Sequence, residues 1–146
     1  MVRTTFAIMT VELTQEVSRR LESDRYGWLT TVAKSGQPVP RLVWFFFDGK
    51  DVTVYSMPNA AKIAHINARP RVSLNLDSDG NGRGTVVVAG AARVDEVGAD
   101  SLADEQYQAK YHDYAVSIGM GDEYLAAFST RLKISVDKVW STPSAG

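Results

Sequence analysis

Two short turns join three consecutive strand-like runs near the start of the chain, and their spacing limits the fold more than any other feature. Residues 26–33 and 38–47 are rich in the aromatic and β-branched side chains that favour strands. Residues 34–37 (KSGQ) have the composition of a hairpin turn, and residues 48–49 (DG) lead into a third run at 51–56. Because a parallel pair needs a much longer crossover connection, we predict that these strands are antiparallel.

The remainder of the chain adds further strands and inserts helices between them. The pattern gives about six strands in hairpin order, with helices after the third and the fifth. This order predicts a mainly β (α+β) fold, a small antiparallel barrel with helices packed outside. The other expected elements are a helix at 11–23 with Thr10 as its N-cap, a helix at 59–68, strands at 71–76 and 85–94 joined by a flexible connection at 77–84, helices at 95–114 and 122–130, a strand at 132–136 or as far as 140, and a flexible tail at about 141–146.

Composition narrows the partners and the chemistry. The 146 residues, 45% of them hydrophobic, suit one domain, 1–146, with its own core, and a net charge of -1 gives no attraction to nucleic acid or anionic membrane. The absence of cysteine excludes thiolate ligands, and His65 and His112 form no metal set, so no metal is predicted. No run approaches the ~20 apolar residues of a membrane span, nor is there a secretory signal, so we expect a soluble cytoplasmic protein.

The segment at 55–63 (YSMPNAAKI) has the chemistry of a phosphate site. A strand ends there, a Pro-Asn break follows, and a helix begins with Lys62 in its first turn. A helix start exposes unpaired N–H groups at the positive end of the helix dipole, which suits a phosphate. Ser56 and Asn59 either donate to the phosphate or cap the helix, since both roles use the same geometry. The candidate site also includes Met57 in the break and the small Ala60 and Ala61, which permit close approach but also simply favour helix.

With these elements placed, the chain resembles the split β-barrel superfamily of pyridoxamine 5′-phosphate oxidase. The resemblance covers residues 21–140 and rests on three segments in order: YGWLTTVAKSGQPVPRLVWFFFDG, VTVYSMPNAAKIAHINARPRVSLNLD and GTVVVAGAARVDE. Within that superfamily the chain is most similar to small actinobacterial-type proteins that bind the deazaflavin coenzyme F-420. It is short, it has Lys62 where those proteins place a lysine facing the cofactor phosphate, and it lacks the C-terminal Arg-Leu extension of the true oxidase.

This resemblance implies a split β-barrel homodimer with cofactor sites at the subunit interface, and hydride transfer between F-420 and a small organic substrate. It also implies that the strand at 38–47 runs under the deazaflavin ring, although ordinary barrel core explains about half of its residues. Alternation places Arg41 and Val43 on one face and Pro40, Leu42 and Trp44 on the other, without showing which face meets the ligand. Arg41 meets an acidic cofactor tail or, more simply, forms an edge salt bridge.

Several alternatives stay open on the sequence alone. FMN would use the same Lys62 helix start, because it too has a phosphate. Two further hypotheses for the function are a flavin or deazaflavin carrier without turnover and a purely structural dimerising barrel. A hydride-transferring cofactor needs no acid–base pair from the protein, and none stands out. Tyr55, Tyr107, Tyr111 and bound water are equal candidates for a proton donor, whereas Trp28 is expected in the core and His65 on the surface.

Overall fold

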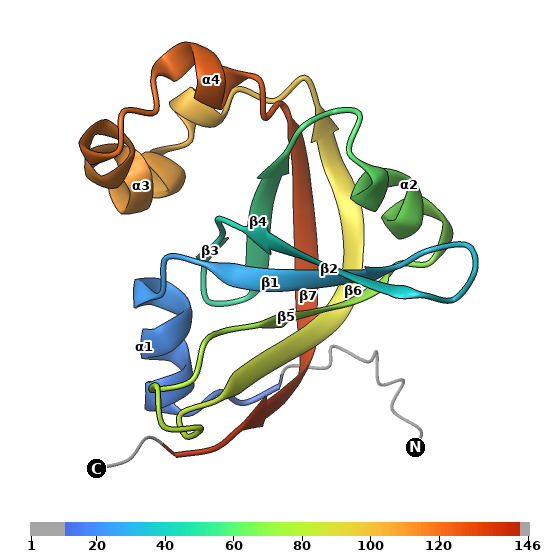
Figure 1. Cartoon of the computed structure of the whole chain (residues 1–146), viewed down its shortest axis with the longest axis vertical. Helices are drawn as coiled ribbons and strands as arrows, with labels where there is room; N and C mark the ends of the chain where they lie inside the picture. The colour runs from blue at the N-terminus through green and yellow to red at the C-terminus, as the bar shows by residue number, and fades with distance from the viewer. Residues whose placement is uncertain (1–10, 144–146) are drawn as a thin grey trace, which may run out of the picture.

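The computed structural model describes residues 11–143 and shows one strongly curled antiparallel sheet with helices around it (Figure 1). The order of the strands in this sheet is β2-β1-β5-β6-β7-β4-β3, and all six pairings are antiparallel. The strands are β1 (Gly27–Val32), β2 (Pro38–Val43), β3 (Phe46–Phe47), β4 (Asp51–Ser56), β5 (Arg71–Asn75), β6 (Val86–Val97) and β7 (Thr130–Ser141). The helices are α1 (Gln15–Ser23), α2 (Ala61–Ala68), α3 (Glu105–Ser117) and α4 (Asp122–Ala126), with a 3-10 turn at Ser101–Ala103.

The curl of the sheet encloses the main core. In Figure 1, β1 and β2 cross in front of the long β6 and β7. The main core cluster contains residues of both pairs of strands, such as Leu29 of β1 and Val88 of β6. Phe45, Val54 and Leu132 are fully buried there, and Val17 and Leu21 of α1 close one end. The predicted split-barrel architecture is therefore confirmed, with seven strands in the described residues rather than about six.

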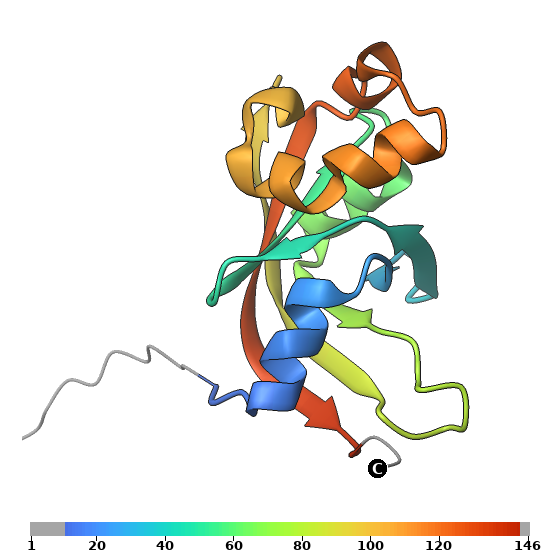
Figure 2. The ribbon, with the colours of Figure 1, turned by 90° about the vertical axis from the view of Figure 1, so that its left-hand side faces the viewer.

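A second, smaller cluster lies on the other face of β3 and β4, beneath α3. It consists of Phe46, Tyr55, Ala99, Tyr107 and Tyr111. Figures 1 and 2 show α1, α3 and α4 along one side of the sheet, with α2 on the opposite side. No helix in residues 11–143 is long and apolar enough to cross a membrane. The sheet is thus covered locally by helices, and the α3–α4 segment stands over the end of β4.

Contacts between α3 and the chain after β2 explain why the run at 38–47 is not one continuous strand. The Tyr111 hydroxyl accepts from the Phe45 N–H at 2.8 Å and lies 2.7 Å from the Phe45 carbonyl. Lys110 donates to the same carbonyl at 2.8 Å, and its ammonium lies 4.0 Å from the centre of the Phe45 ring. Burial lowers the pKa of Lys110 to about 8. These side chains take the backbone groups that a sheet neighbour would otherwise bond, so β2 ends at Val43 and β3 begins at Phe46.

Other element boundaries also differ from the sequence expectation. β6 continues to Val97, where a helix was predicted, because it pairs with the start of β7 through an irregularity after Val94. α1 begins at Gln15 with Thr14 as its N-cap, so the expected helix start was too early, and Thr10 lies outside the described residues. β7 runs to Ser141, and Thr142 donates to the Thr85 carbonyl at 3.0 Å, so the expected tail is partly attached to the sheet.

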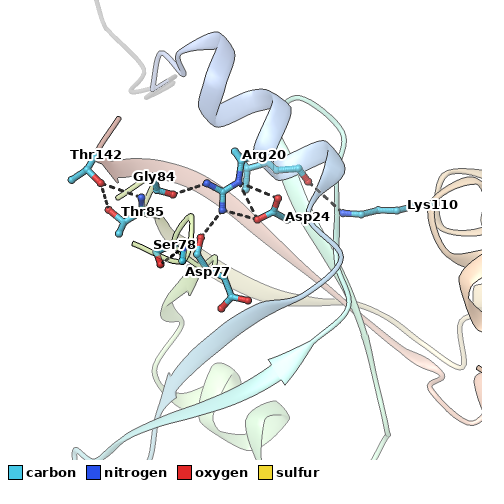
Figure 3. A network of polar contacts seen from close by, with 10 residues as sticks. Arg20, Asp24, Asp77, Ser78, Gly84, Thr85, Lys110 and Thr142 are labelled. Atoms are coloured by element: carbon cyan, nitrogen blue, oxygen red, sulfur yellow. Dashed lines mark hydrogen bonds and ion pairs between the residues drawn. The ribbon is translucent and has the colours of Figure 1, made fainter. Parts of the chain in front are cut away.

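The connection between β5 and β6 is held at both ends by Arg20 of α1 (Figure 3). The guanidinium donates to the carbonyls of Asp77 and Gly84, both at 2.5 Å, and forms an ion pair with Asp24 at 2.8 Å. The side chain of Arg20 is only 11% exposed. Although the sequence predicted a flexible connection at 77–84, its first and last residues are therefore fixed to α1.

Candidate functional site

A cavity of about 190 Å³ opens where β2, β4 and α2 meet the α3–α4 segment. One part of its wall comes from the end of β2 and from Trp44 just after it. Lys62 of α2 contributes the cationic group, and the remaining walls are mostly aromatic. The lining residues are Leu42, Val43, Trp44, Tyr55, Lys62, Tyr107, Met120, Tyr124, Leu125 and Phe128. An apolar cavity with a few placed polar groups is the usual form of a cofactor or substrate site.

Lys62 lies half-buried in this cavity, and no residue of the described range 11–143 serves as its counter-ion. Within residues 11–143 its ammonium makes no hydrogen bond or ion pair. Burial, and secondarily the nearby Arg41 guanidinium, lower the pKa of Lys62, because both disfavour its charged form. An anionic group bound beside Lys62 would relieve both effects. The site therefore has the electrostatics of an anion site.

The N-terminus of α2 adds to the positive potential at the same place. Its N-cap residue is Ala60, which offers no side-chain oxygen, and the first turn of α2 holds no acidic residue. Neither Ser56 nor Asn59 caps the helix, so the capping alternative for these residues was wrong. Neither the N-cap nor the first turn of α2 thus offers a carboxylate to the positive end of the helix dipole.

The other residues predicted around this helix start take different positions. Ser56 is buried in β4 and its hydroxyl donates to the Met57 carbonyl at 2.9 Å. Met57 is half-buried, whereas Asn59 and Ala61 are exposed. None of these four residues lines the cavity. From the segment at 55–63, the cavity is lined by Tyr55 near the end of β4 and by Lys62 of α2.

Strand β2 forms an open edge of the sheet beside the cavity. Among the described strands it pairs only with β1, and Pro40, Arg41 and Leu42 are exposed. Leu42 and Trp44 reach the cavity from one face, while Val43 lines it and also joins the core. Arg41 donates to the Pro40 carbonyl at 2.9 Å and forms no ion pair within the described residues, so the expected edge salt bridge is absent there.

The sequence did not predict that aromatic side chains form much of the cavity wall. The ring of Trp44 stacks on Tyr111 with centroids 4.6 Å apart and planes 5° from parallel. Tyr107 packs against the rings of Tyr55 and Tyr111 at 4.9 and 5.2 Å. The sequence indicates Tyr55, Tyr107 and Tyr111 only as candidate proton donors. Met120, Tyr124, Leu125 and Phe128 gave no local signal, because only the folding of α3 and α4 over β4 places them at the cavity.

Two further expectations fall near the cavity. Trp28 was predicted in the core, but it lies beside Leu42 on the outer face of the β1–β2 hairpin and is 40% exposed. His65 was predicted on the surface, yet it is half-buried, with its Nδ1 atom 2.8 Å from the Thr31 hydroxyl. The described residues contain no group of three or more metal-ligating side chains.

Comparison with known proteins agrees with this architecture. Residues 13–142 match the family model described as pyridoxamine 5′-phosphate oxidase. The chain belongs to this family. Members of the pyridoxamine 5′-phosphate oxidase family share the flavin-binding split barrel, and the predicted family resemblance is therefore confirmed. No curated protein matches the chain.

Several solved structures share the fold at low sequence identity. An F420 reductase superposes with a TM-score of 0.63 at 20% identity, over 88% of this chain and 98% of that one. The conserved hypothetical protein Rv2991 from Mycobacterium tuberculosis superposes with a TM-score of 0.69 at 20% identity, over 96% of this chain and 90% of that one. HutZ, a heme storage protein from Vibrio cholerae, superposes with a TM-score of 0.60 at 12% identity, over 88% of this chain and 91% of that one. These likenesses establish the fold and leave the ligand to be argued from the site.

Proposed function

We propose that this protein is an oxidoreductase that binds coenzyme F-420 and transfers a hydride between the deazaflavin and a small organic substrate. The observation that carries the proposal is the Lys62 ammonium at the cavity, which has no partner within residues 11–143 and lies in a first turn of α2 that holds no acidic residue. The similarity in fold to an F420 reductase agrees with it. F-420 supplies the hydride chemistry when bound, and the protein binds and orients it.

The residues present fit a phosphorylated ring cofactor. Lys62 and the first N–H groups of α2 would hold the phosphate, as helix N-termini commonly do. Leu42, Val43 and Trp44 would form the apolar support of the ring. The aromatic side chains opposite them would exclude water from the reacting atoms.

The choice between F-420 and FMN rests on Arg41. This second cation lies close enough to Lys62 to depress its pKa, and no carboxylate in the described residues pairs with it. FMN would place one phosphate against two cations. F-420 has a longer acidic tail, so it could satisfy both, and we therefore prefer F-420 and keep FMN as the second candidate.

We further propose that a second copy of the chain completes the site. β2 is an unpaired edge, and Trp28 and Leu42 form an apolar pair on its outer side, 40% and 51% exposed. A partner packed over this pair would cover the open side of the cavity, and closed two-fold dimers are the commonest oligomers. Exposed apolar groups of this kind often mark interfaces.

The dimer is tested by measuring mass in solution by light scattering. We expect twice the 16.0 kDa of the chain for the wild type and the single-chain mass for Trp28→Glu. Trp140→Glu is the matched control, since Trp140 is 55% exposed and does not line the cavity, and it should stay dimeric. A wild-type protein of single-chain mass contradicts the proposed assembly.

The cofactor is tested by titrating the protein with F-420 and, in parallel, with FMN, following quenching of tryptophan fluorescence. Trp44 lines the cavity, so binding there should quench it. We expect micromolar binding of F-420 and much weaker binding of FMN. The reverse preference would assign the protein to FMN, and binding of neither would contradict a phosphorylated ring cofactor at this site.

A further inference from the structure

Three buried tyrosines lie at or behind the cavity, and their hydroxyl groups differ in what they bond. Tyr55 donates to the Asp104 carboxylate at 2.6 Å. Tyr111 bonds the backbone of Phe45 and the Arg25 carbonyl. Burial raises the pKa of both hydroxyls, so both stay protonated. The hydrogen-bonding capacity of these two groups is thus used within the fold.

The hydroxyl of Tyr107 is different. Its side chain is 5% exposed and lines the cavity, yet within residues 11–143 the hydroxyl has no hydrogen-bond partner. The fully enclosed side-chain atoms without a partner in this part of the chain are Asp51 Oδ1 and Thr53 Oγ1. The Tyr107 oxygen is not among them, so it keeps some exposure, and the Tyr107 side chain lines the cavity.

The surroundings fix this hydroxyl as a neutral donor. The rings of Tyr55 and Tyr111 hold the Tyr107 ring in place, and the Asp104 carboxylate accepts from the Tyr107 N–H at 3.2 Å. Burial, and then Asp104, raise the pKa of Tyr107 to about 12. The charge of Asp104 acts on the Tyr107 hydroxyl and disfavours an anionic ligand beside it, whereas Lys62 favours one at its own place in the cavity.

We propose that Tyr107 donates a hydrogen bond to the substrate, and that it selects uncharged, planar compounds with a carbonyl-type acceptor. The apolar lining from Trp44, Leu125 and Phe128 would accept a flat hydrocarbon body, and the buried Tyr107 would supply the donor beside it. A site with one buried donor rejects analogues that lack the acceptor, because the donor is then left unpaired. The identity of this ligand as the substrate rests on the proposed function, whereas the hydrogen bond itself does not.

The test uses two ligands of the same shape, acetophenone and α-methylstyrene, in which a C=CH₂ group replaces the C=O. Binding is followed by tryptophan fluorescence, and the infrared C=O stretch of bound acetophenone reports the hydrogen bond directly. We expect the wild type to prefer the ketone by about 3- to 10-fold, the range for one neutral hydrogen bond, and the bound C=O stretch to move to lower wavenumber. In Tyr107→Phe both the preference and the shift should disappear.

Tyr26→Phe is the matched control, because it also removes a tyrosine hydroxyl, one bonded to Tyr114 and outside the cavity lining. It should keep both signals. An unshifted C=O stretch in the wild type, equal binding of the two ligands, or no binding of either would overturn the proposal. The experiment needs no cofactor, so these results are independent of whether Lys62 binds F-420. Conversely, if F-420 did not bind, the infrared C=O stretch of bound acetophenone would still test the Tyr107 hydrogen bond.

Discussion

Gly90→Ala is expected to destabilise the protein by about 3 kcal/mol or more, at the upper end of overpacking substitutions, because the added methyl group meets backbone. A Cβ atom on residue 90 would lie 1.8 Å from the Ser135 carbonyl oxygen and 2.7 Å from its carbon. Gly90 lies at the irregularity between β6 and β7, where Val136 is its partner. Removing this clash would require β6 and β7, the two longest strands of the sheet, to move apart. Urea unfolding followed by circular dichroism measures the change.

Gly121→Ala is the control for this substitution. Gly121 precedes α4 with φ at -82°, and a Cβ atom there would meet nothing within 4 Å. Its unfolding free energy should therefore stay within about 0.5 kcal/mol of the wild type. If Gly90→Ala proved as stable as Gly121→Ala, the close approach of β6 and β7 would be wrong.

Lys62→Met is expected to weaken cofactor binding by about 5- to 150-fold, which corresponds to the ~1–3 kcal/mol of a charge-assisted hydrogen bond. Methionine keeps the apolar length of the side chain and removes only the ammonium. Because Lys62 makes no bond within the described residues and burial already disfavours its charge, the fold should lose no stability. Titration with F-420 and urea unfolding on the same preparation measure the two effects separately.

Lys138→Met is the matched control, since Lys138 is exposed on β7 and does not line the cavity. It should bind F-420 as the wild type does. Unchanged affinity in Lys62→Met would contradict the assignment of Lys62 to the phosphate.

The features of the fold that local chemistry determines could be predicted from the sequence. The two short turns after β1 and β3 require antiparallel neighbours, and the structure has them. Lys62 was singled out because its place after a strand and a Pro-Asn break marks a helix start. Such signals depend on a few adjacent residues, which is why they survive without tertiary information.

The features that depend on distant contacts could not be predicted. The break after β2 is set by Tyr111 and Lys110, more than sixty residues later in the chain. The extension of β6 to Val97 depends on pairing with β7, which overrides the helical pattern. The hydrogen-bonding state of each tyrosine likewise follows from the packing of α3, so the sequence left Tyr55, Tyr107 and Tyr111 equivalent.

The central claim is that Lys62 and the start of α2 recognise the phosphate of a deazaflavin cofactor. The most direct measurement compares the affinity of F-420 with that of its deazaflavin chromophore lacking the phosphate and tail, in the wild type and in Lys62→Met. We predict that the wild type prefers F-420 by about tenfold or more, as expected for a charge-assisted contact, and that Lys62→Met loses most of this preference. Equal affinity for the two ligands in the wild type, or the same preference in both proteins, would contradict the account.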